Sequence, residues 1–335
     1  MTEPASNRLL APNYRISVDG RDITPTIESR LVSLRLEETR GEDADRLDLT
    51  LTDNDGKLAI PRQGTTIAVA IGWEGQQLVD KGTFKVDEVE HSGAPDQVTL
   101  RARSADLAHT LRQRRDQSWH QLTLEQILHT IATRNGLLPR IHAELASVAI
   151  AHIDQTNESD LNFLTRLSKR FDAVATAKKD NLLFLPINSA TNSKGQSLPS
   201  FSITRADGDS HRYHQSDQDS YTGVRAYWHD GKKADRTGVV VGTKVNLKTL
   251  KETYSSEADA MAAAKAEWQR LQRGAANFTL TLAVGNPMLV PQTQVTVRGF
   301  KSQIDGTGWL AVRTTHSLED GGFTTQVEME TDTPS

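Results

Sequence analysis

Short stretches in which apolar and polar residues alternate are the feature that most limits the fold of this chain. They occur at residues 47–51, 67–71, 98–102 and 323–329. A period of two places the apolar side chains on one face, which predicts β-strands that are buried on one side. Many short strands at this spacing are typical of a barrel or a sandwich. Residues 14–104 and the C-terminal part of the chain are therefore predicted to be β-rich.

The two β-rich ends share several features in the same order. Each has a proline, an alternating strand, a glycine, a second strand that reaches His-Ser, and a third alternating strand. Chance similarity between strands is the alternative, but the agreement in order and spacing favours an internal duplication. The features lie at Pro61, 67–71, Gly82, His91-Ser92 and around Leu100 in one copy, and at Pro291, 295–297, Gly308, His316-Ser317 and around Val327 in the other.

The middle of the chain changes to a helical pattern. From Thr123, apolar residues recur at helical spacing, Gln126 completes a capping box, and Gly136 is a natural stop. A second helix is predicted to begin near Glu158. Strands are expected around Val174 and at residues 182–185, so residues 106–190 are predicted to form a mixed α+β unit.

The overall prediction is a β-rich α+β fold with two similar β-barrel domains separated by a smaller α+β domain. The first barrel is expected at residues 1–105 and the α+β domain at 106–190. The second barrel is expected at 191–335. It would include a polar linker near 188–200 and an inserted helix at 256–273, with Ser256 and Asp259 as its capping box.

The segment QTNESDLNFLTRL, residues 155–167, places Glu158, Ser159 and Asp160 side by side. Two neighbouring carboxylates suggest acid/base chemistry, but on a helix positions 158 and 160 point to different sides. Asn157 followed three residues later by Asp160 fits a capped helix start instead. We therefore interpret the cluster as the beginning of a helix rather than as a catalytic pair.

Bulk composition excludes several classes of protein. There are 39 Lys and Arg residues against 43 Asp and Glu, which gives no general attraction to nucleic acid or to anionic membranes. There is no cysteine, so disulfides and thiolate chemistry are excluded. The N-terminus lacks a signal-peptide pattern, and no segment approaches the ~18 apolar residues of a membrane span.

The segment at 155–167 resembles the Gln-x-x-Glu-Ser-Asp-x-x-Phe-Leu-x-Arg-Leu segment of the phage late control D family. Members of that family are tail hub proteins of contractile phages, similar to the N-terminal hub part of VgrG spike proteins. One departure is Gln292, where the family pattern leads us to expect glycine after Pro291. Other segments agree in the expected order, namely SADLAHTLRQRRDQSWHQLTLEQILHTIATRNGL, YTGVRAYWHD and GWLAVRTTHSLEDGGFTTQVEME.

The resemblance implies a trimeric baseplate hub that works mechanically. Two similar barrels in each of three chains would present six modules and could match a six-fold tail tube to a three-fold spike. The expected partners are two further copies of the chain, the tube protein, the spike, the tape measure and other baseplate proteins. Because the sequence given ends at Ser335 without a β-helical extension, the spike is expected to be a separate protein. The expected location is the virion tail, after assembly in the host cytoplasm.

Two polar stretches have some features of metal sites. His211 and His214 have ligand-like spacing, but tetrahedral zinc needs further defined ligands, and a solvated polar loop is the preferred interpretation. Asp53-Asn54-Asp55-Gly56 is reminiscent of a calcium loop, but Lys57 and Leu58 occupy positions where a ligand and a glycine are required. No metal, cofactor or catalytic residue is assigned.

The densest basic stretch comprises five arginines followed by Trp119 and His120. Asp106 and Asp116 dilute its charge, and no nucleic-acid recognition motif surrounds it, so a subunit interface or solvated surface is preferred. The arginines are Arg101, Arg103, Arg112, Arg114 and Arg115.

Three alternatives to a phage baseplate hub remain open from the sequence. The chain could be a hub from a secretion system or a tailocin, which the residues do not distinguish from a phage. It could be a peptidoglycan-degrading tail enzyme, although no G-x-S-x-G, P-loop or H-E-x-x-H motif occurs. It could also be a DNA-binding regulator, against which the balanced charge argues.

Overall fold

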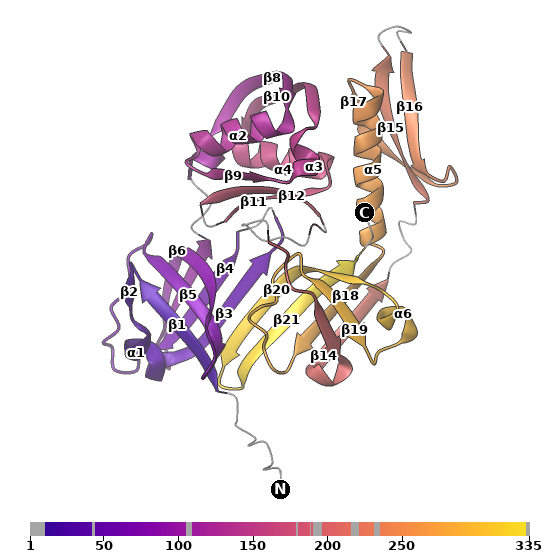
Figure 1. Cartoon of the computed structure of the whole chain (residues 1–335). Coiled ribbons are helices and arrows are strands. Elements are labelled where there is room, and N and C mark those ends of the chain that lie inside the picture. Colours follow the sequence, from indigo (N-terminus) through magenta and orange to yellow (C-terminus); the bar gives the residue numbers. More distant parts are fainter. Residues whose placement is uncertain are drawn as a thin grey trace.

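The computed structural model describes most of the 335 residues. Its helices and strands form one large sheet at the base of Figure 1 and two smaller units beside each other on one side of it. Within the part of the chain that is described, no helix is both long and apolar enough to cross a membrane. The described residues are 11–41, 44–104, 109–178, 180–187, 189, 196–215, 221–230 and 235–332.

The large sheet contains strands from both ends of the chain. Eleven of them form a continuous hydrogen-bonded path, and β19 (Gln294–Arg298) and β13 (Phe201–Thr204) extend from the side of this path at β20. In spatial order the path runs through β14 (Gly208–Gln215), β18 (Ala276–Leu282), β21 (Gly322–Thr331), β20 (Trp309–Glu319), β3 (Leu31–Thr39), β4 (Arg46–Thr52), β7 (Gln97–Ser104), β6 (Val79–Ser92), β5 (Thr66–Trp73), β1 (Pro12–Val18) and β2 (Arg21–Asp22).

The two halves of the sheet have the same strand order. The N-terminal half follows β3-β4-β7-β6-β5-β1, and the C-terminal half follows β14-β18-β21-β20-β19-β13. Each half has five neighbouring strand pairs, and four of the five are antiparallel in both halves. The fifth differs, because β13 runs parallel to β19 whereas β1 runs antiparallel to β5. This shared order is the arrangement that the sequence repeat predicts.

The β-bulges of the two halves also coincide. A β-bulge is a local feature that fixes register, so agreement at two equivalent places is a stronger sign of relatedness than strand order alone. Aligning the bulges makes His91 equivalent to His316, as the sequence comparison expects. The register shifts lie at Leu31/Ser33 in the β3–β4 pair and Gly208/Ser210 in the β14–β18 pair, and at Val86/Glu88 in the β6–β7 pair and Ala311/Arg313 in the β20–β21 pair.

The expected two separate closed barrels are not what the ladders show. Residues Arg313–Leu318 of β20 pair with Leu34–Thr39 of β3, so the two halves are joined in one sheet. Across the described strands this sheet is an open path, closed in neither half. The core of the N-terminal half accordingly includes Leu318 and Phe323 from the C-terminal half. The β-rich character is as predicted, and the β3–β20 strand pair connects the two halves.

A turn before β5 and its counterpart before β19 show why glycine is expected after Pro291. Gly64 has φ +86 and donates its N–H to Val86 O, and Gln292 has φ +72 and donates to the equivalent Ala311 O. The two turns thus have the same left-handed conformation, in which a side chain is strained. Gln292 adopts it despite its side chain.

Replacing Gly64 with alanine is expected to lower the free energy of unfolding by about 1 kcal/mol, because the added Cβ disfavours positive φ. The space itself is adequate, since the nearest atom to that Cβ would be Lys85 Cε at 3.5 Å. The shift in the denaturant midpoint measures the effect. Gly274→Ala is the control, because Gly274 has φ −74 and should tolerate alanine. Equal effects of both substitutions would contradict the explanation.

The middle unit packs two helices between two small sheets. Its core contains Trp119, Ile127, Phe163 and Phe184 among others. The predicted Thr123–Gln126 capping box is present at the start of the first helix. The elements are β8 (Arg114–Thr123) paired with β10 (Ala149–Ser159), β11 (Ala173–Lys178), β12 (Asn181–Pro186) and β9 (Leu138–Ile141) in a second sheet, and the helices α2 (Leu124–Arg134), α3 (Ala143–Ala146) and α4 (Asp160–Arg170).

A separate three-stranded sheet covers one face of the long helix α5 (Glu257–Arg273). Its strands β15 (Gly223–Asp230), β16 (Asp235–Gly242) and β17 (Leu247–Tyr254) pair with one another, and none of their described residues pairs with the large sheet. Ser256 caps α5 as predicted. Residues 188 and 190–195 of the predicted linker at 188–200 lie outside the described residues.

Salt bridges fasten α5 and the middle unit together. Arg170 of α4 binds Asp259 at 2.7 Å, and Arg273 binds Asp172. Figure 1 shows these two units standing next to each other above the sheet. The remaining short elements are α1 (Thr24–Ile27), α6 (Ser302–Asp305) and the 3-10 turns η1 (Glu28–Arg30), η2 (His109–Arg112) and η3 (Arg205–Asp207).

Candidate functional site

The cluster at Glu158, Ser159 and Asp160 starts helix α4, as predicted. The capping residue is Ser159, whose hydroxyl accepts a hydrogen bond from the Asn162 N–H at 3.2 Å. The expected cap, Asn157, is wrong, because Asn157 lies in the β10 bulge with φ +46 and its N–H binds Asp116. The helix therefore begins two residues later than that cap would require.

Asp160 is a fully buried carboxylate with several donors around it. Arg134 makes two contacts to it, one from Nε at 2.8 Å. Asn135 Nδ2 and Gln155 Nε2 donate to it at 2.9 and 2.8 Å. Arg115 lies 3.5 Å away. A carboxylate with this many donors is held firmly in place, which suits a structural role.

The other charged and aromatic side chains of the segment point elsewhere. Glu158 pairs with Arg166 at 2.8 Å, on a different side from Asp160. Phe163 stacks on Trp119 with ring centroids 6.1 Å apart, and Arg166 lies over the Phe163 ring, 5.0 Å from its centroid. The two carboxylates share no partner among the described residues, so they form no acid/base pair. The segment fixes α4 onto β8, β10 and α2.

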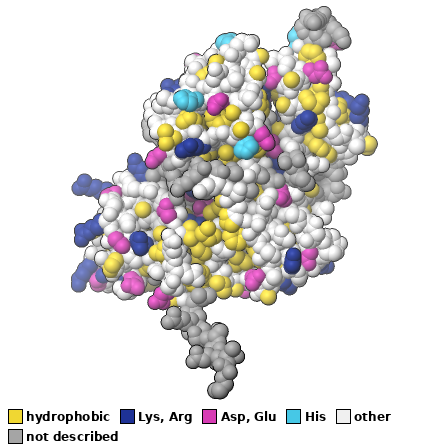
Figure 2. All heavy atoms as spheres, viewed as in Figure 1, with side chains coloured by type: hydrophobic (Ala, Val, Ile, Leu, Met, Phe, Trp, Pro, Cys, Tyr) yellow, Lys and Arg dark blue, Asp and Glu magenta, His cyan; other side chains and the backbone are white. Residues whose placement is uncertain are grey.

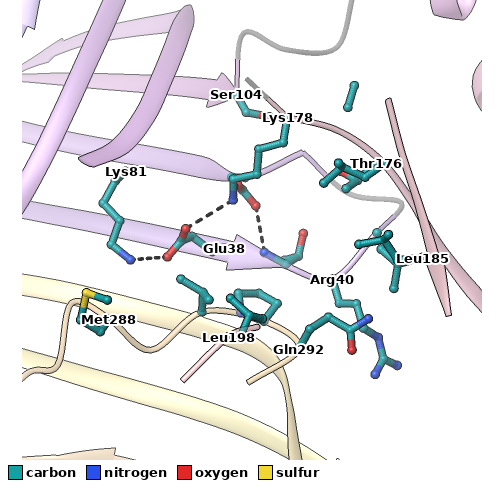
Figure 3. A pocket seen from close by; sticks show the side chains of 18 of the residues that line it. Glu38, Arg40, Lys81, Ser104, Thr176, Lys178, Leu185, Leu198, Met288 and Gln292 are labelled. Carbon is teal, nitrogen blue, oxygen red and sulfur yellow. Dashed lines mark hydrogen bonds and ion pairs between the residues drawn. The ribbon is translucent and has the colours of Figure 1, made fainter. Parts of the chain in front are cut away.

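The junction of the three main parts of the chain holds a buried ionic cluster that sequence reasoning missed. Glu38 of β3 accepts a hydrogen bond from Lys81 of β6 at 2.6 Å, and both side chains are almost fully buried. Lys178 of β11 lies 3.5 Å from the same carboxylate and 3.0 Å from Asp45. Figure 3 shows Glu38 between the two lysines. Strands of the N-terminal half and of the middle unit are thereby linked through one carboxylate.

The C-terminal half contributes His316 of β20 to this cluster. Its Nε2 lies 3.0 Å from Lys81 Nζ and 3.4 Å from Glu38, and its Nδ1 lies 2.9 Å from Thr325 Oγ1. Because the Lys81 ammonium can only donate, Nε2 is the acceptor and Nδ1–H donates to Thr325. All three parts of the protein thus meet at one cluster.

Burial and charge set the protonation of the cluster. Burial alone would disfavour the Glu38 carboxylate, but Lys81 and Lys178 outweigh it and hold the pKa of Glu38 well below its usual value. Burial and the Lys81 ammonium lower the pKa of His316 to about 4. Burial raises the pKa of Asp45, against the pull of Lys178. At neutral pH His316 is therefore neutral beside an ion pair.

A cavity of about 430 Å³ opens beside this cluster. Charged groups line one part of it and apolar groups another, and Figure 2 shows apolar side chains gathered where the two β-rich halves meet. The charged side chains of the cluster that line the cavity already form ion pairs with one another. The cavity is therefore better suited to packing against another group than to chemistry. Lining residues include Glu38, Lys81, Lys178, Leu198, Met288 and Gln292.

The alternation of apolar and polar residues along β3 and β20 contains a sign of this cluster. Glu38 falls in phase with Leu34 and Leu36, both fully buried, and His316 falls in phase with Leu318. A charged residue in the apolar phase of a strand indicates a buried, paired charge. Its partners, however, come from strands far away in the chain.

The residues weighed as metal ligands do not converge. His211 and His214 lie on strand β14 rather than in the predicted loop, and three residues apart on a strand they face opposite sides. His211 contacts the Phe300 ring at 5.0 Å. Asp53 accepts the Leu58 N–H at 2.9 Å. No group of three His, Asp or Glu side chains suited to a metal occurs among the described residues.

The basic stretch does not form one patch. Arg101 and Arg103 pair with the acidic side chains of β6, whereas Arg115 turns toward Asp160. Trp119 is buried, and exposed His120 stacks on His152. The described basic side chains are therefore divided between the sheet surface and the middle unit.

Two related β-halves, an α+β unit and polar clusters used for holding these parts together define a structural protein of a β-rich assembly. The model of the phage tail baseplate hub (GPD) family matches residues 29–322, so the chain belongs to this family. The resemblance expected from the sequence is confirmed: the chain is a baseplate hub protein, similar to those of phages P2 and 186.

The relatives match over nearly their whole length. A probable baseplate hub protein of Escherichia phage P2 is 40% identical over 361 residues, covering 96% of this chain and 93% of the relative. The probable baseplate hub protein of Escherichia phage 186 is 39% identical over 362 residues, with the same coverage.

Solved structures share the fold at low identity. The 43 kDa tail protein of prophage MuSo2 from Shewanella oneidensis has a TM-score of 0.69 at 18% identity, covering 95% of this chain and 98% of that one. An Escherichia coli component of the type VI secretion system has a TM-score of 0.56 at 15% identity, covering 95% and 77%. This agrees with the expected similarity to VgrG.

Proposed function

We propose that this hub acts as a homotrimer that adapts a six-fold tail tube to a three-fold spike. The shared strand order and shared bulges of the two halves carry this proposal. Three chains would supply six related modules, which can make similar contacts with six tube subunits although the chains number three. The modules need not be closed barrels for this.

Likeness to spike-associated proteins supports the spike as a partner. A Francisella PdpA-VgrG complex contains a chain with a TM-score of 0.56 at 9% identity, covering 98% of this chain and 60% of that one. The tube protein, the tape measure and other baseplate proteins are the further partners proposed. The location proposed is the virion tail, reached after assembly in the host cytoplasm.

We further propose that the hub works without catalysis. The described carboxylates that first suggested an acid/base pair, Glu158 and Asp160, are each engaged with arginines. The proposed domains are residues 1–105, 106–190 and 191–335. Three hydrophobic clusters, one centred in each of these parts, support that division, and the first of them also takes in Leu318 and Phe323. The β15–β17 sheet with α5 adds a fourth cluster within the last domain.

The proposed trimer can be tested by measuring the molar mass of the protein in solution. Light scattering on the full chain is expected to give three times the chain mass of 37.0 kDa, and the mixture with its spike should give that mass plus the mass of the spike. Images of the trimer viewed along its axis should show six similar lobes in a ring. A monomer both alone and with the spike, over a wide concentration range, would refute the proposal.

A further inference from the structure

Inside one chain, the two β-rich halves (here called modules) are joined where β3 pairs with β20. We call such a strand pair between two modules a joint. Residues Arg313–Leu318 of β20 pair on one side with β21 and on the other with β3. The first residues of β20, Trp309 and Leu310, pair with β19 instead. The second half of β20 is thus the place where a strand from the other module attaches.

The equivalent edge on β6 has no such partner. The β5 ladder covers Val79–Lys85 of β6, and no strand among the described residues pairs with 88–92 on that side. Glu88 is 61% exposed, whereas the equivalent Arg313, under β3, is 39% exposed. The strand that corresponds to β3 is β14, which pairs with β18 alone in the described structure. Among the described strands, the edge of β6 at residues 88–92 and the free edge of β14 therefore both lack a strand partner.

We propose that β14 of one chain adds antiparallel to residues 88–92 of β6 in a second copy of this chain. This inference rests on the trimer proposed above and specifies its subunit contact. The intrachain register, carried over through the aligned bulges, places Glu90 opposite His214, His91 opposite Tyr213 and Ser92 opposite Arg212. Three such joints would alternate with three intrachain joints around the ring.

The charges at the two joints are complementary with reversed sign. Inside the chain, Arg313 lies 3.6 Å from both Glu328 of β21 and Glu37 of β3. At the open edge the equivalent Glu88 pairs with Arg101 of β7 at 2.6 Å. The position equivalent to Glu37 on β14 is His214. Inside the chain, Arg313 thus lies between two glutamates. In the proposed contact between chains, Glu88 would lie between Arg101 and His214.

This reversal would also discourage wrong pairings. If β3 were to add to β6, Glu37 would face Glu90, and two like charges directly opposite each other destabilise a strand pair. If β14 were to add to β20, His214 would take the place of Glu37, and Arg313 would lose that acidic neighbour. Each edge is thereby matched to one partner, as specificity through repulsion requires. Arg212, diagonal to Glu90 in the proposed joint, adds to the attraction.

Cysteine cross-linking tests the register directly, because the chain contains no cysteine. Opposite residues of an antiparallel pair have Cα atoms about 4.5–5.5 Å apart, within disulfide range. The full-length double variant Glu90→Cys/His214→Cys, oxidised alone and in assembled particles, is expected to give covalent dimers and trimers on a non-reducing gel. The readout is the fraction of chain in those bands.

Two matched variants calibrate the result. Glu37→Cys/Thr315→Cys lies at the equivalent intrachain pair and should form a disulfide without linking chains. Glu90→Cys/Tyr213→Cys is displaced by one residue and should not link, because neighbouring strand residues face opposite sides. A trimer by mass in which the intrachain pair forms but the 90–214 pair does not would overturn this joint and leave the trimer standing. A monomer throughout would overturn both.

A charge exchange gives a readout that does not depend on oxidation. Glu90→Lys is expected to weaken association by about threefold at each joint, and Glu90→Lys combined with His214→Glu should restore it. The measurement is the trimer dissociation constant by sedimentation. Weakening without restoration by the second change would refute the opposition of these two residues.

Discussion

Replacing Asp160 with alanine is expected to lower the stability of the middle unit by about 3 kcal/mol, the lower end of the range for breaking a buried ion pair. The carboxylate is fully buried and neutralises Arg134, while Asn135 and Gln155 donate to it as well. Without it, these donors lose their acceptor in a site closed to water. Arg134 retains 20% exposure, which limits the loss.

Hydrogen exchange on peptides from residues 114–170 measures this local effect. A loss of about 3 kcal/mol corresponds to roughly a hundredfold faster exchange of the protected α4 amides. Glu158→Ala in the same segment is the matched control. Its partner Arg166 is 40% exposed, and such a pair contributes about 1 kcal/mol or less. If the two variants behaved alike, the structural reading of the segment would be wrong.

Much of the β-structure was predictable because it depends on local alternation. The strands around Leu49, Val69, Leu100 and Val327 appear where a period of two indicates them. The order of features in the two ends also predicted which strands correspond, since equivalent strands carry the same turns and His-Ser pairs. Alternation reports which face of a strand is buried, and the structure agrees on that point.

The connection between the halves was not predictable in the same way. Which strand lies beside β20 depends on hydrogen bonds between backbone edges, and these leave no pattern in the side chains. Closed barrels were therefore expected, whereas β3 joins β20. The loop expected at His211 and His214 is a strand for a related reason. An exposed edge strand carries polar side chains on both faces, so it lacks alternation.

The helix start shows a similar limit. Asn157 and Ser159 are both suitable caps, and the choice between them is made by β10, whose bulge takes up Asn157 before the helix begins. The alternation marks Glu38 and His316 as buried, but it could not show that these residues meet Lys81 and Lys178 in one cluster. Its members lie on four strands separated by up to 278 positions, and only the folded sheet brings them together.

Acidification is expected to destabilise the junction between the halves, with His316 as a main cause. The pKa of His316 is about 4 in the folded protein against a usual 6.5. Between these values the unfolded chain binds a proton that the folded chain does not, so stability is lost as pH falls from 6.5 to 4. This difference in the pKa of His316 between the unfolded and folded states corresponds to a loss of about 3 kcal/mol in the free energy of unfolding. Glu38, with its lowered pKa, adds to the loss at lower pH, and Asp45, with its raised pKa, offsets part of it.

The comparison of His316→Gln with the unsubstituted protein isolates this contribution. The midpoint of denaturant unfolding, measured from pH 7.5 to 4.5 at constant ionic strength, should fall less steeply in the variant, because glutamine gains no proton. His129→Gln, at an exposed position on α2, should keep the full pH dependence. The opening equilibrium that hydrogen exchange reports for the backbone amides of β3 and β20 should become more favourable in the same pH window, since the cluster stabilises the pairing of these two strands. An unchanged pH slope in His316→Gln would show that this imidazole does not control the junction.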